Sequence, residues 1–345
     1  MRTVLHLLNT STYSGAENVA ITIIRAMSAR YPDCRLIYVS PDGPIRERLE
    51  LEGVEFEPIK AITLREIRRV VKKYKPDVIH AHDFTASIMS AFATLRTPVI
   101  SHIHNNVPWL KRLGVKSVLY GVSCMRYRRI LGVSPSVFEE FVFGGLIKKK
   151  SEVIGNPVDL SVIRAAAERA ENKDGYDVVF LGRLSEAKGP LEFVEVISTL
   201  SKFMKVSAVM IGDGELRVAV AEKISALGLT DTVKLLGFMD NPHGVLGASC
   251  ILCMTSTWEG YGLVAAEALA LGKPVVATRV GGIPTILKNI GYLCDTKEEI
   301  TDGLLALLSD GELYREASRK ALERATELDN MTEYIDGLNR IYTEE

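Results

Sequence analysis

Two glutamates in the C-terminal half could supply carboxylates to a ligand rich in hydroxyl groups. Glu259 and Glu267 stand eight positions apart, one at the mouth of an expected helix and one two turns inside it. At about 1.5 Å per helical residue, their separation along the axis is at most about 12 Å. This length suits a sugar joined through a diphosphate to a ribose. We therefore expect one carboxylate to accept hydrogen bonds from a sugar and the other from a ribose.

The residues between the two glutamates favour phosphate binding. Apolar residues predict buried strands over Cys250–Met254 and Pro274–Thr278, and a helix is expected between them at Gly260–Leu271. The first N–H groups of a helix have no partner within it and attract anions, and glycine lets a ligand approach the backbone closely. The expected nucleotide-binding residues of this segment are Gly260, Tyr261, Gly262 and Leu263.

Glu267 is the more informative of the two carboxylates, because paired glutamates at this spacing also arise by chance. The positions three and four residues on either side of it hold only apolar residues: Leu263, Val264, Ala270 and Leu271. Its own helix therefore offers no ion-pair partner. A carboxylate on an apolar face needs a partner from elsewhere, which a bound ligand could provide.

A second pattern, at the end of another expected strand, suits a diphosphate. Gly182-Arg183 is followed by Lys188-Gly189-Pro190, which starts a helix. Arginine can bind phosphate oxygens bidentately, and lysine adds a compact charge. Glu186 lies between the two cations, so a surface salt bridge is the alternative interpretation.

Four histidines occur near the ends of two expected strands: His80, His82, His102 and His104. Such a group could suggest a metal ion, but no Asp, Glu or Cys joins it at the spacing of metal ligands. Because side chains alternate along a strand, each pair is expected to share a face only within its own strand. We therefore expect no metal site here.

The N-terminal half begins with an expected strand at Val4–Leu8, a polar loop and a helix that runs to Met27. Ligands of doubly wound sheets bind at this edge, where strands end and helices begin. Gly15, in the loop, is the expected point of close approach to a ligand, although it could also serve the turn alone. Further strands alternate with helical patterns, which predicts an α/β protein with parallel sheets and covering helices.

The length of 345 residues can hold two domains of ordinary size. The net charge of −1 hides an asymmetry: residues 1–170 carry 25 Lys and Arg against 16 Asp and Glu, and the remainder carries 17 against 27. The basic half suggests an anionic surface or acceptor as partner. Five cysteines, an odd number, fit a reducing cytosol. Without a signal-peptide pattern or an apolar run near about 20 residues, we expect a cytoplasmic protein.

The stretch 84–138 contains seven basic residues and no acidic one. The apolar residues interleaved with them include Trp109, Leu110, Leu113, Val118, Leu119 and Val122. A basic amphipathic segment with an aromatic anchor can lie in a membrane interface, so residues 107–131 are a candidate contact with an anionic membrane surface. A core helix with a solvated basic face is the alternative. No signature of nucleic-acid binding occurs, so we expect no nucleic acid as partner.

The run from Glu259 to Gly282 resembles the donor-binding motif of family 4 retaining glycosyltransferases, which have the GT-B fold. The shared features are the two glutamates with Glu-Gly-Tyr-Gly-Leu, the following Ala-Leu-Gly-Lys-Pro-Val-Val-Ala, and Gly281-Gly282. The resemblance extends to Gly-Arg-Leu-x-x-x-Lys-Gly at 182–189 and to Asn156-Pro-Val-Asp159. It departs at Ser14, because the family usually has two glycines where this chain has Ser14-Gly15.

This resemblance implies two facing Rossmann-like domains with parallel sheets. The first would span residues 1–160 on the acceptor side, with a C-terminal helix at 331–345 packed back onto it. The second, residues 161–330, would bind the nucleotide sugar, and residues 160–175 would link the two. The resemblance also implies nucleotide contacts from the loop at Gly212 and a place for His104 beside the donor sugar.

We therefore predict a retaining glycosyltransferase of the hexosyltransferase class. It would move a hexose or N-acetylhexosamine from a nucleotide-diphosphate sugar, with UDP as the first choice, to a glycan or lipid-linked acceptor in cell-surface polysaccharide biosynthesis. Arg183 and Lys188 would stabilise charge on the leaving diphosphate. Glu259 would orient the sugar, Glu267 would hold the ribose, and His104 would line the sugar pocket.

No Asp-x-Asp pair of the kind that holds a metal against a diphosphate occurs, so we expect no cofactor and no metal requirement. The protein would be cytoplasmic or peripheral on the cytoplasmic face of the membrane. One alternative is a catalytically silent nucleotide-sugar-binding subunit. A second is an NAD-dependent oxidoreductase, but Gly212-Asp213-Gly214 lacks the third glycine of a dinucleotide-binding fingerprint.

Overall fold

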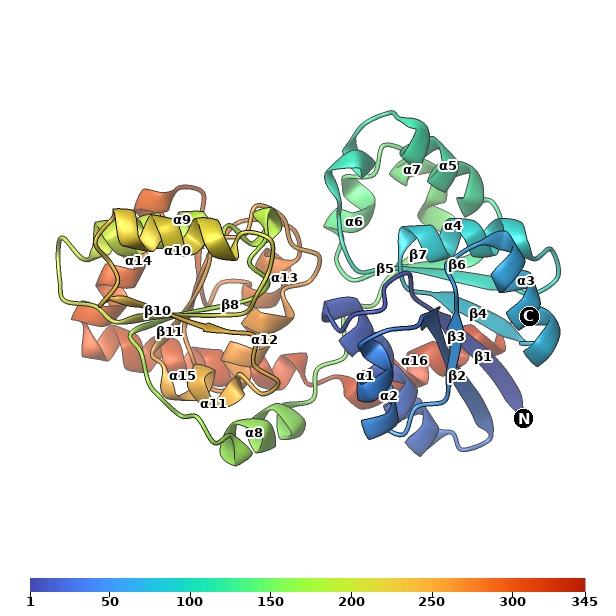
Figure 1. The fold of residues 1–345 in the computed structure, drawn as a ribbon, viewed down its shortest axis with the longest axis horizontal. Coiled ribbons are helices and arrows are strands. Elements are labelled where there is room, and N and C mark those ends of the chain that lie inside the picture. The colour runs from blue at the N-terminus through green and yellow to red at the C-terminus, as the bar shows by residue number, and fades with distance from the viewer. Residues whose placement is uncertain (345) are drawn as a thin grey trace. The chain divides into compact units, whose positions relative to one another are not determined.

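The computed structural model describes residues 1–344. The chain divides into two compact units (Figure 1). Unit 1 consists of Met1–Pro157 and the C-terminal segment from Asn330, and unit 2 consists of Val158–Asp329. Each unit is a parallel β-sheet with helices, as the alternation of strand and helix patterns predicted.

Unit 1 contains a seven-stranded sheet with the order β3-β2-β1-β4-β5-β6-β7. Its strands are β1 (Arg2–Leu7), β2 (Cys34–Pro41), β3 (Phe56–Ile59), β4 (Val78–Ala81), β5 (Val99–Ile103), β6 (Tyr127–Gly132) and β7 (Ser151–Val153). The order runs outward in both directions from β1 and β4, so the loops after these two strands lie at a switch point of the topology.

The helices of unit 1 cover this sheet. They are α1 (Gly15–Arg30), α2 (Ile45–Leu51), α3 (Leu64–Tyr74), α4 (Phe84–Ala93), α5 (Val115–Cys124), α6 (Ser136–Glu139), α7 (Gly144–Ile147) and α16 (Met331–Thr343), with short 3₁₀ turns η1 (Pro108–Lys111) and η2 (Lys148–Lys150). The last helix, α16, packs beside α1 (Figure 1). Its Asp336 forms an ion pair with Arg30 and accepts a hydrogen bond from the hydroxyl of Tyr31 at 2.6 Å.

Unit 2 contains a six-stranded sheet with the order β10-β9-β8-β11-β12-β13. Its strands are β8 (Val178–Leu181), β9 (Ala208–Ile211), β10 (Val233–Gly237), β11 (Ile251–Met254), β12 (Val275–Thr278) and β13 (Tyr292–Cys294). Every residue of β11 is buried, because helices cover both faces of the sheet. The switch point of this sheet lies between β8 and β11.

The helices of unit 2 are α8 (Leu160–Arg169), α9 (Pro190–Leu200), α10 (Arg217–Ala226), α11 (His243–Ala248), α12 (Leu263–Ala270), α13 (Ile283–Leu287), α14 (Lys297–Ser309) and α15 (Gly311–Leu328), with the 3₁₀ turn η3 (Glu186–Lys188). Helices α9, α10 and α14 lie on one face of the sheet, and α11, α12 and α15 on the other (Figure 1). Phe193 and Ile197 of α9 belong to the buried core beneath the first group.

The expected linker at residues 160–175 is wrong for most of its length, because residues 160–169 form α8. Asp159 caps this helix by accepting hydrogen bonds from the N–H groups of Ser161 and Val162, at 2.9 and 3.1 Å. The helix packs against α11 and α12, and Arg164 donates to the carbonyl of Ala270 at 3.1 Å. Alanine and arginine are strong helix formers, so the composition read as a linker also favours a helix.

The helix predicted from Gly260 also begins later, at Leu263. Gly262 precedes it with a φ of 97°, a left-handed conformation that suits glycine. Gly260 and Tyr261 therefore lie in the loop that leads into α12. None of the helices within residues 1–344 is long and apolar enough to cross a membrane.

Candidate active site

Two loops of unit 2 lie side by side at the carboxyl edge of its sheet. One follows β8 and the other follows β11, which are neighbours in the sheet although they are not consecutive. The N–H of Thr257 donates to the carbonyl of Ala187 at 2.9 Å, and the hydroxyl of Thr255 donates to the carbonyl of Gly189 at 2.7 Å. Ligands of open α/β sheets bind at such a point.

A third loop, after β12, supports this pair through two glycines. A Cβ atom on Gly281, whose φ is 55°, would lie 1.7 Å from the carbonyl oxygen of Glu259. A Cβ atom on Gly282 would lie 2.4 Å from the carbonyl oxygen of Gly260. Only glycine permits both approaches, so Gly281-Gly282 fixes the backbone that carries Glu259.

Lys188 and Glu259 form an ion pair at the junction of these loops. The ammonium group of Lys188 contacts Oε2 of Glu259, and Oε1 accepts a hydrogen bond from the N–H of Gly260 at 3.2 Å. The two side chains are 27% and 12% exposed, so the pair is shielded but open on one side. It can present an N–H donor to phosphate and a carboxylate oxygen to a hydroxyl within one small region.

Both cations of the Arg183–Lys188 loop form ion pairs, as the alternative interpretation expected, but with partners other than Glu186. No ion pair joins Glu186 to either cation within residues 1–344, because Lys188 contacts Glu259 and Arg183 lies 3.3 Å from Glu215. The side chain of Arg183 is 69% exposed. Its guanidinium group is therefore open to solvent at the edge of the sheet where the strands end.

Glu267 has a partner on a neighbouring helix. Its Oε2 lies 3.6 Å from Nε2 of His243, the first residue of α11, and its side chain is 19% exposed. The expectation that this carboxylate finds a partner outside its own helix is confirmed. The identity of the partner depends on the packing of α11 against α12, which residue spacing does not predict.

The start of α12 lies between the two glutamates. Ala265 makes the first backbone hydrogen bond of the helix, to the carbonyl of Gly262 at 2.9 Å. The N–H groups of Leu263 and Val264 precede that bond and belong to the helix terminus that attracts anions. The helix dipole and the Lys188 ammonium group both favour negative charge in this region.

Gly212 serves the packing of two backbone loops rather than a direct contact with a ligand. Its N–H donates to the carbonyl of Gly237 at 2.8 Å. With a φ of 136°, a Cβ atom at this position would lie 2.0 Å from the carbonyl oxygen of Gly182. The close crossing of two backbone loops therefore accounts for this glycine, and any ligand contact would come from other atoms of the loop.

In unit 1, Gly15 begins α1 with free space around it. No heavy atom lies within 4 Å of a Cβ built on this residue. The hydroxyl of Ser14, which replaces the first glycine of the family pattern, donates to the buried carboxylate of Glu17, as does the hydroxyl of Thr10. Ser14 therefore organises the first turn of α1, and Gly15 leaves room beside it.

Five histidines gather on one face of the unit 1 sheet, rather than the two separate pairs that were expected. They are His6, His80, His82, His102 and His104. Neighbouring parallel strands place residues in register on the same face: His6 pairs with His80, and Ala81 pairs with Ser101, which aligns the residues that follow them. The spacing did not reveal His6, although its position near the end of the first strand was a usable signal.

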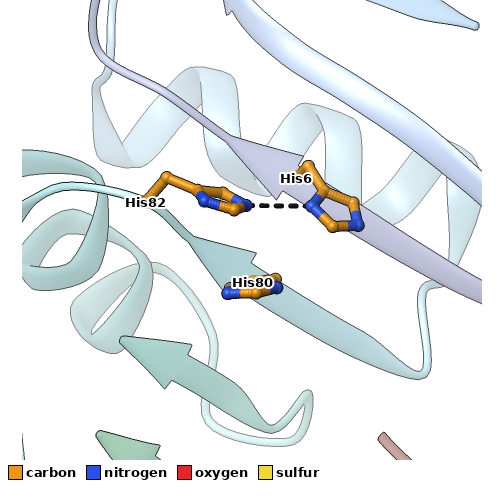
Figure 2. A group of neighbouring side chains, drawn as sticks. All are labelled: His6, His80 and His82. Carbon is orange, nitrogen blue, oxygen red and sulfur yellow. Dashed lines mark hydrogen bonds between the residues drawn. The ribbon is translucent and has the colours of Figure 1, made fainter. Parts of the chain in front are cut away.

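The histidine rings contact one another through their nitrogens. Nδ1 of His6 lies 2.9 Å from Nε2 of His82 (Figure 2), and Nδ1 of His82 lies 3.0 Å from Nε2 of His104. Nε2 of His80 lies 3.1 Å from Nδ1 of His102, and Nδ1 of His80 lies 2.6 Å from the hydroxyl of Tyr342. His104 therefore turns both nitrogens into the protein, since its Nδ1 is also buried.

Burial keeps these rings neutral. It lowers the pKa of His6 and of His104 to about 3, and the pKa values of His80, His82 and His102 well below the ordinary value for histidine. The neighbouring amide of Asn156 opposes the lowering of the pKa at His104. Ring nitrogens come within 4.8 Å of one another in two groups of three, one of which comprises His6, His80 and His82.

Two Rossmann-like sheets, one of them with an ion pair and a helix N-terminus at its switch point, are the architecture of glycosyltransferases with the GT-B fold. The chain belongs to the family 4 glycosyltransferases: the model Glycosyltransferase Family 4 matches residues 13–162, and the model Glycosyl transferases group 1 matches residues 163–324. The fold and the family predicted from the sequence are thereby confirmed.

Characterised relatives share about a quarter of their residues with this chain. The N-acetyl-alpha-D-glucosaminyl L-malate synthase of Bacillus anthracis is 27% identical, over 74% of this chain and 77% of the relative. A Campylobacter jejuni enzyme is 25% identical, over 94% and 95%. Its name is N-acetylgalactosamine-N,N'-diacetylbacillosaminyl-diphospho-undecaprenol 4-alpha-N-acetylgalactosaminyltransferase.

Solved structures confirm the fold over the whole chain. HepE from Anabaena, crystallised in complex with UDP and glucose, superposes with a TM-score of 0.86 at 21% identity and covers 100% of both chains. TarM from S. aureus superposes with a TM-score of 0.82 at 13% identity, also over the full length of both. At these identities the likeness concerns the fold.

Proposed function

We propose that this glycosyltransferase moves a hexose or N-acetylhexosamine, with retention of configuration, from a UDP-sugar to a glycan or lipid-linked acceptor in cell-surface polysaccharide biosynthesis. The observation that carries the proposal is the pairing of Lys188 with Glu259 beside the N-terminus of α12, at the switch point of unit 2. Anionic and hydroxyl-bearing parts of one ligand would meet complementary groups there. The UDP complexes of HepE and the undecaprenol-linked acceptor in the Campylobacter enzyme's name support this donor and acceptor.

In the proposed reaction, the bond between the anomeric carbon and the diphosphate oxygen breaks while a bond to the acceptor oxygen forms on the same face. The hydroxyl proton of the acceptor leaves with the diphosphate. Arg183, Lys188 and the N–H groups of Leu263 and Val264 stabilise the charge that develops on the leaving group. No resident metal takes part in this proposal.

The two glutamates divide the remaining work. Glu259, next to the Lys188 ammonium group, orients the sugar by accepting hydrogen bonds from its hydroxyl groups. Glu267 accepts those of the ribose, with His243 behind it to hold the carboxylate in place. Because a shielded carboxylate without partners is costly, Glu259 is paired with Lys188, and Glu267 lies 3.6 Å from the imidazole of His243.

A membrane contact is part of the proposal, in a form that the structure modifies. Of the apolar residues expected at this surface, Leu110 is buried and Trp109 is half-buried, with its ring edge-on against Phe84 at 4.8 Å. The others are exposed: Leu113, Val118, Leu119 and Val122. The most exposed apolar side chains of this region occur on and around α5. They include Leu95, Leu113, Val115, Met125 and Leu146, each at least 75% exposed. With the basic residues of the same region, they would contact an anionic lipid surface.

The membrane contact is tested by sedimentation with lipid vesicles. The protein should bind vesicles that contain anionic lipid and should bind neutral phosphatidylcholine vesicles much less. The double variant Leu113→Ser and Val115→Ser should bind anionic vesicles less tightly while its nucleotide affinity stays the same. Equal binding of the variant and the native protein would refute the assignment of this face.

The donor is tested by thermal shift with UDP, GDP, ADP and NAD. A ligand at 100 times its dissociation constant should stabilise the protein by about 2.7 kcal/mol. We expect UDP to raise the unfolding midpoint, Glu267→Ala to abolish the increase, and Glu312→Ala, an exposed glutamate on α15, to retain it. Stabilisation by NAD alone would refute the proposal.

Turnover distinguishes an enzyme from a silent binding subunit. The α-linked UDP-sugars of the hexose and N-acetylhexosamine series are incubated with lipid-linked acceptors, and the anomeric configuration of the product is read by NMR. An α-linked product supports retention, and a β-linked product refutes it. Nucleotide binding without transfer or hydrolysis of any of these donors would favour the silent subunit.

A further inference from the structure

A short turn before α11 fixes the orientation of the His243 ring. The segment Asn241-Pro242-His243 leads into this helix, and Oδ1 of Asn241 accepts from the backbone N–H of His243 at 3.3 Å. Asparagine favours such turns because its side chain can bond to the backbone two residues further on. The same oxygen lies 3.1 Å from Nδ1 of the His243 ring. One amide oxygen therefore holds both the backbone and the ring of His243.

The other end of the Asn241 amide decides which ring nitrogen carries a proton. Its Nδ2 donates to the carbonyl of Ala166 on α8 at 2.8 Å. A carbonyl oxygen only accepts, so the amide nitrogen must face Ala166 and the amide oxygen must face His243. That amide oxygen also only accepts, so Nδ1 of His243 is a protonated nitrogen. In the neutral ring, Nε2 is then a bare acceptor.

This second ring nitrogen stands beside the carboxylate of Glu267. Nε2 of His243 lies 3.6 Å from Oε2 of Glu267, which is longer than a hydrogen bond. A charge-assisted N–H···O contact closes to about 2.7–2.9 Å, and the Lys188–Glu259 pair has closed to hydrogen-bonding contact. The wider spacing at Glu267 therefore indicates two acceptors side by side rather than a donor and an acceptor.

A ligand that reaches Glu267 also reaches the His243 ring. The two side chains are 19% and 20% exposed, so neither is sealed in the interior. His243 begins α11, and Glu267 lies in α12, whose side chains point back toward the start of that helix. Both helices lie on the same face of the unit 2 sheet (Figure 1). The two acceptors thus belong to one small, partly exposed region.

Two neighbouring acceptors suit two neighbouring donors. A ribose carries two hydroxyl groups on adjacent carbons, and each can donate one hydrogen bond. We propose that His243 is a ribose-binding residue that accepts one of these hydroxyls through Nε2 while Glu267 accepts the other. Asn241 is the positioning residue that keeps Nε2 free to accept. The presence of a ribose beside Glu267 rests on the proposed function, whereas the proton on Nδ1 of His243 does not.

An imidazolium ring is the competing explanation. With a second proton on Nε2, His243 would donate to Glu267, and only the carboxylate would remain to accept hydroxyl groups. The other charged residues on the helices that pack against α11 are Arg164, Glu168 and Arg169 of α8, and none of them forms an ion pair with His243 within residues 1–344. The two explanations therefore differ in one measurable feature, the proton on Nε2.

The first test reads the His243 ring by NMR at pH 8, in the full-length protein with and without UDP. Long-range ¹H–¹⁵N spectra of a sample labelled with ¹⁵N-histidine separate protonated from bare ring nitrogens, and the His243→Asn variant assigns the signals. We expect a protonated Nδ1 and a bare Nε2. In Asn241→Leu, the proton should no longer be confined to Nδ1. A proton on Nε2 of the native protein, in an imidazolium or in the other neutral form, would overturn the proposal.

A matched pair of substitutions separates the acceptor from the rest of the ring. In His243→Asn, the amide N–H takes the place of Nδ1 and keeps the bond to Asn241, but nothing replaces Nε2. In His243→Gln, the amide oxygen can reach the place of Nε2 and accept a hydroxyl. If the ring only supports the Glu267 carboxylate, the choice of nucleotide should not distinguish these variants.

The dissociation constants of UDP, 2′-deoxy-UDP and 3′-deoxy-UDP measure the contact. In the native protein, loss of either hydroxyl should weaken binding about tenfold, which corresponds to one hydrogen bond. His243→Asn should weaken UDP binding by a similar factor. It should bind one of the two deoxynucleotides as tightly as UDP, within about twofold, because the hydroxyl that His243 accepts is no longer recognised. Asn241→Leu should resemble His243→Asn, and His243→Gln should stay closer to the native protein.

The outcomes distinguish this inference from the proposed function. If UDP binding requires Glu267 but His243→Asn weakens all three nucleotides equally, the proposed function stands and the ribose contact of His243 is refuted. If the native protein distinguishes neither deoxynucleotide from UDP, no ribose hydroxyl is recognised and the inference fails. If UDP does not bind the native protein at all, the proposed donor and this contact fail together.

Discussion

Mild acid is expected to destabilise unit 1 selectively, because four of its histidines cannot take up a proton in the folded state. The side chains of His6, His80, His82 and His102 are at most 1% exposed, and burial lowers the pKa of each far below its ordinary value. His104 is not counted with these four histidines, because it is only half-buried. In the unfolded chain all of these rings titrate near a pKa of about 6.5.

The sign follows from proton linkage. Below about pH 6.5 the unfolded state binds protons that the folded state excludes, so the free energy of unfolding falls as the pH falls. Between pH 7 and pH 5.5 each ring lowers the free energy of unfolding by about 1.2 kcal/mol, and four rings lower it by about 5 kcal/mol. The stability that the four neutral rings contribute is fully present above the pKa of histidine in the unfolded chain, and it is lost progressively as the pH falls below that value.

Asp83, the N-cap of α4, acts in the opposite direction. Burial raises its pKa to about 6, although hydrogen bonds from the N–H groups of Ala86 and Asn9 oppose the increase. The folded state therefore takes up a proton at Asp83 over the same pH range, which raises the free energy of unfolding by about 0.8 kcal/mol. The net loss is about 4 kcal/mol, a large part of the roughly 5–15 kcal/mol that stabilises a typical domain.

Urea unfolding at several pH values measures this loss in each unit. The chain has two tryptophans, Trp109 in unit 1 and Trp258 in unit 2, so Trp258→Phe leaves a fluorescence reporter in unit 1 and Trp109→Phe leaves one in unit 2. We expect the unit 1 midpoint to fall steeply below about pH 6.5. The unit 2 midpoint should change much less, because that unit contains only His243.

A change of less than about 1 kcal/mol in unit 1 between pH 7 and pH 5.5 would refute the reasoning, as would an equal change in both units. A His80→Asn variant provides a further check. It should be less stable at pH 7 because it disrupts the contact with Tyr342, but its stability should depend less on pH by about 1.2 kcal/mol over this range.

Three further perturbations address the active site. Lys188→Ala should lower kcat by about 10² to 10³ because it removes a cation from the leaving group, and an unchanged kcat in a transfer assay would contradict this role. Gly281→Ala should destabilise unit 2 by more than about 2 kcal/mol in urea, because its Cβ would lie 1.7 Å from a backbone oxygen, whereas Gly15→Ala, with open space around it, should cost less than about 1 kcal/mol. Excess EDTA should leave the transfer rate unchanged. Loss of activity that Mn²⁺ restores would show a metal requirement.

Local sequence signals account for the bounds of some helices. Helix α3 at Leu64–Tyr74 is one, because Thr63 caps it by accepting from the N–H of Glu66 at 3.2 Å and its buried face carries Ile67 and Val70. Helix α14 at Lys297–Ser309 is another, with Thr296 as its cap. In both cases the cap and the apolar spacing lie within a few residues of one another.

Local signals failed where the conformation of glycine or long-range packing set the bounds or the role of a helix. The helix expected from Gly260 begins at Leu263, because the loop before it is held against Gly281 and Gly282 of another strand connection. Most of the segment expected to link the domains is helix α8, which packs against α11 and α12 of unit 2. Composition alone cannot distinguish a solvated helical linker from a packed helix.

The sequence by itself determined the class of fold and the two-domain family, and it predicts a group of residues for the donor site. It did so because strand and helix periodicity, glycines at turns and the order of charged residues are all local properties. Only the tertiary structure decided that Lys188 pairs with Glu259, 71 positions away, and that five histidines share one face. These contacts follow from which strands are neighbours in each sheet, and the strand order is set by packing over the whole unit.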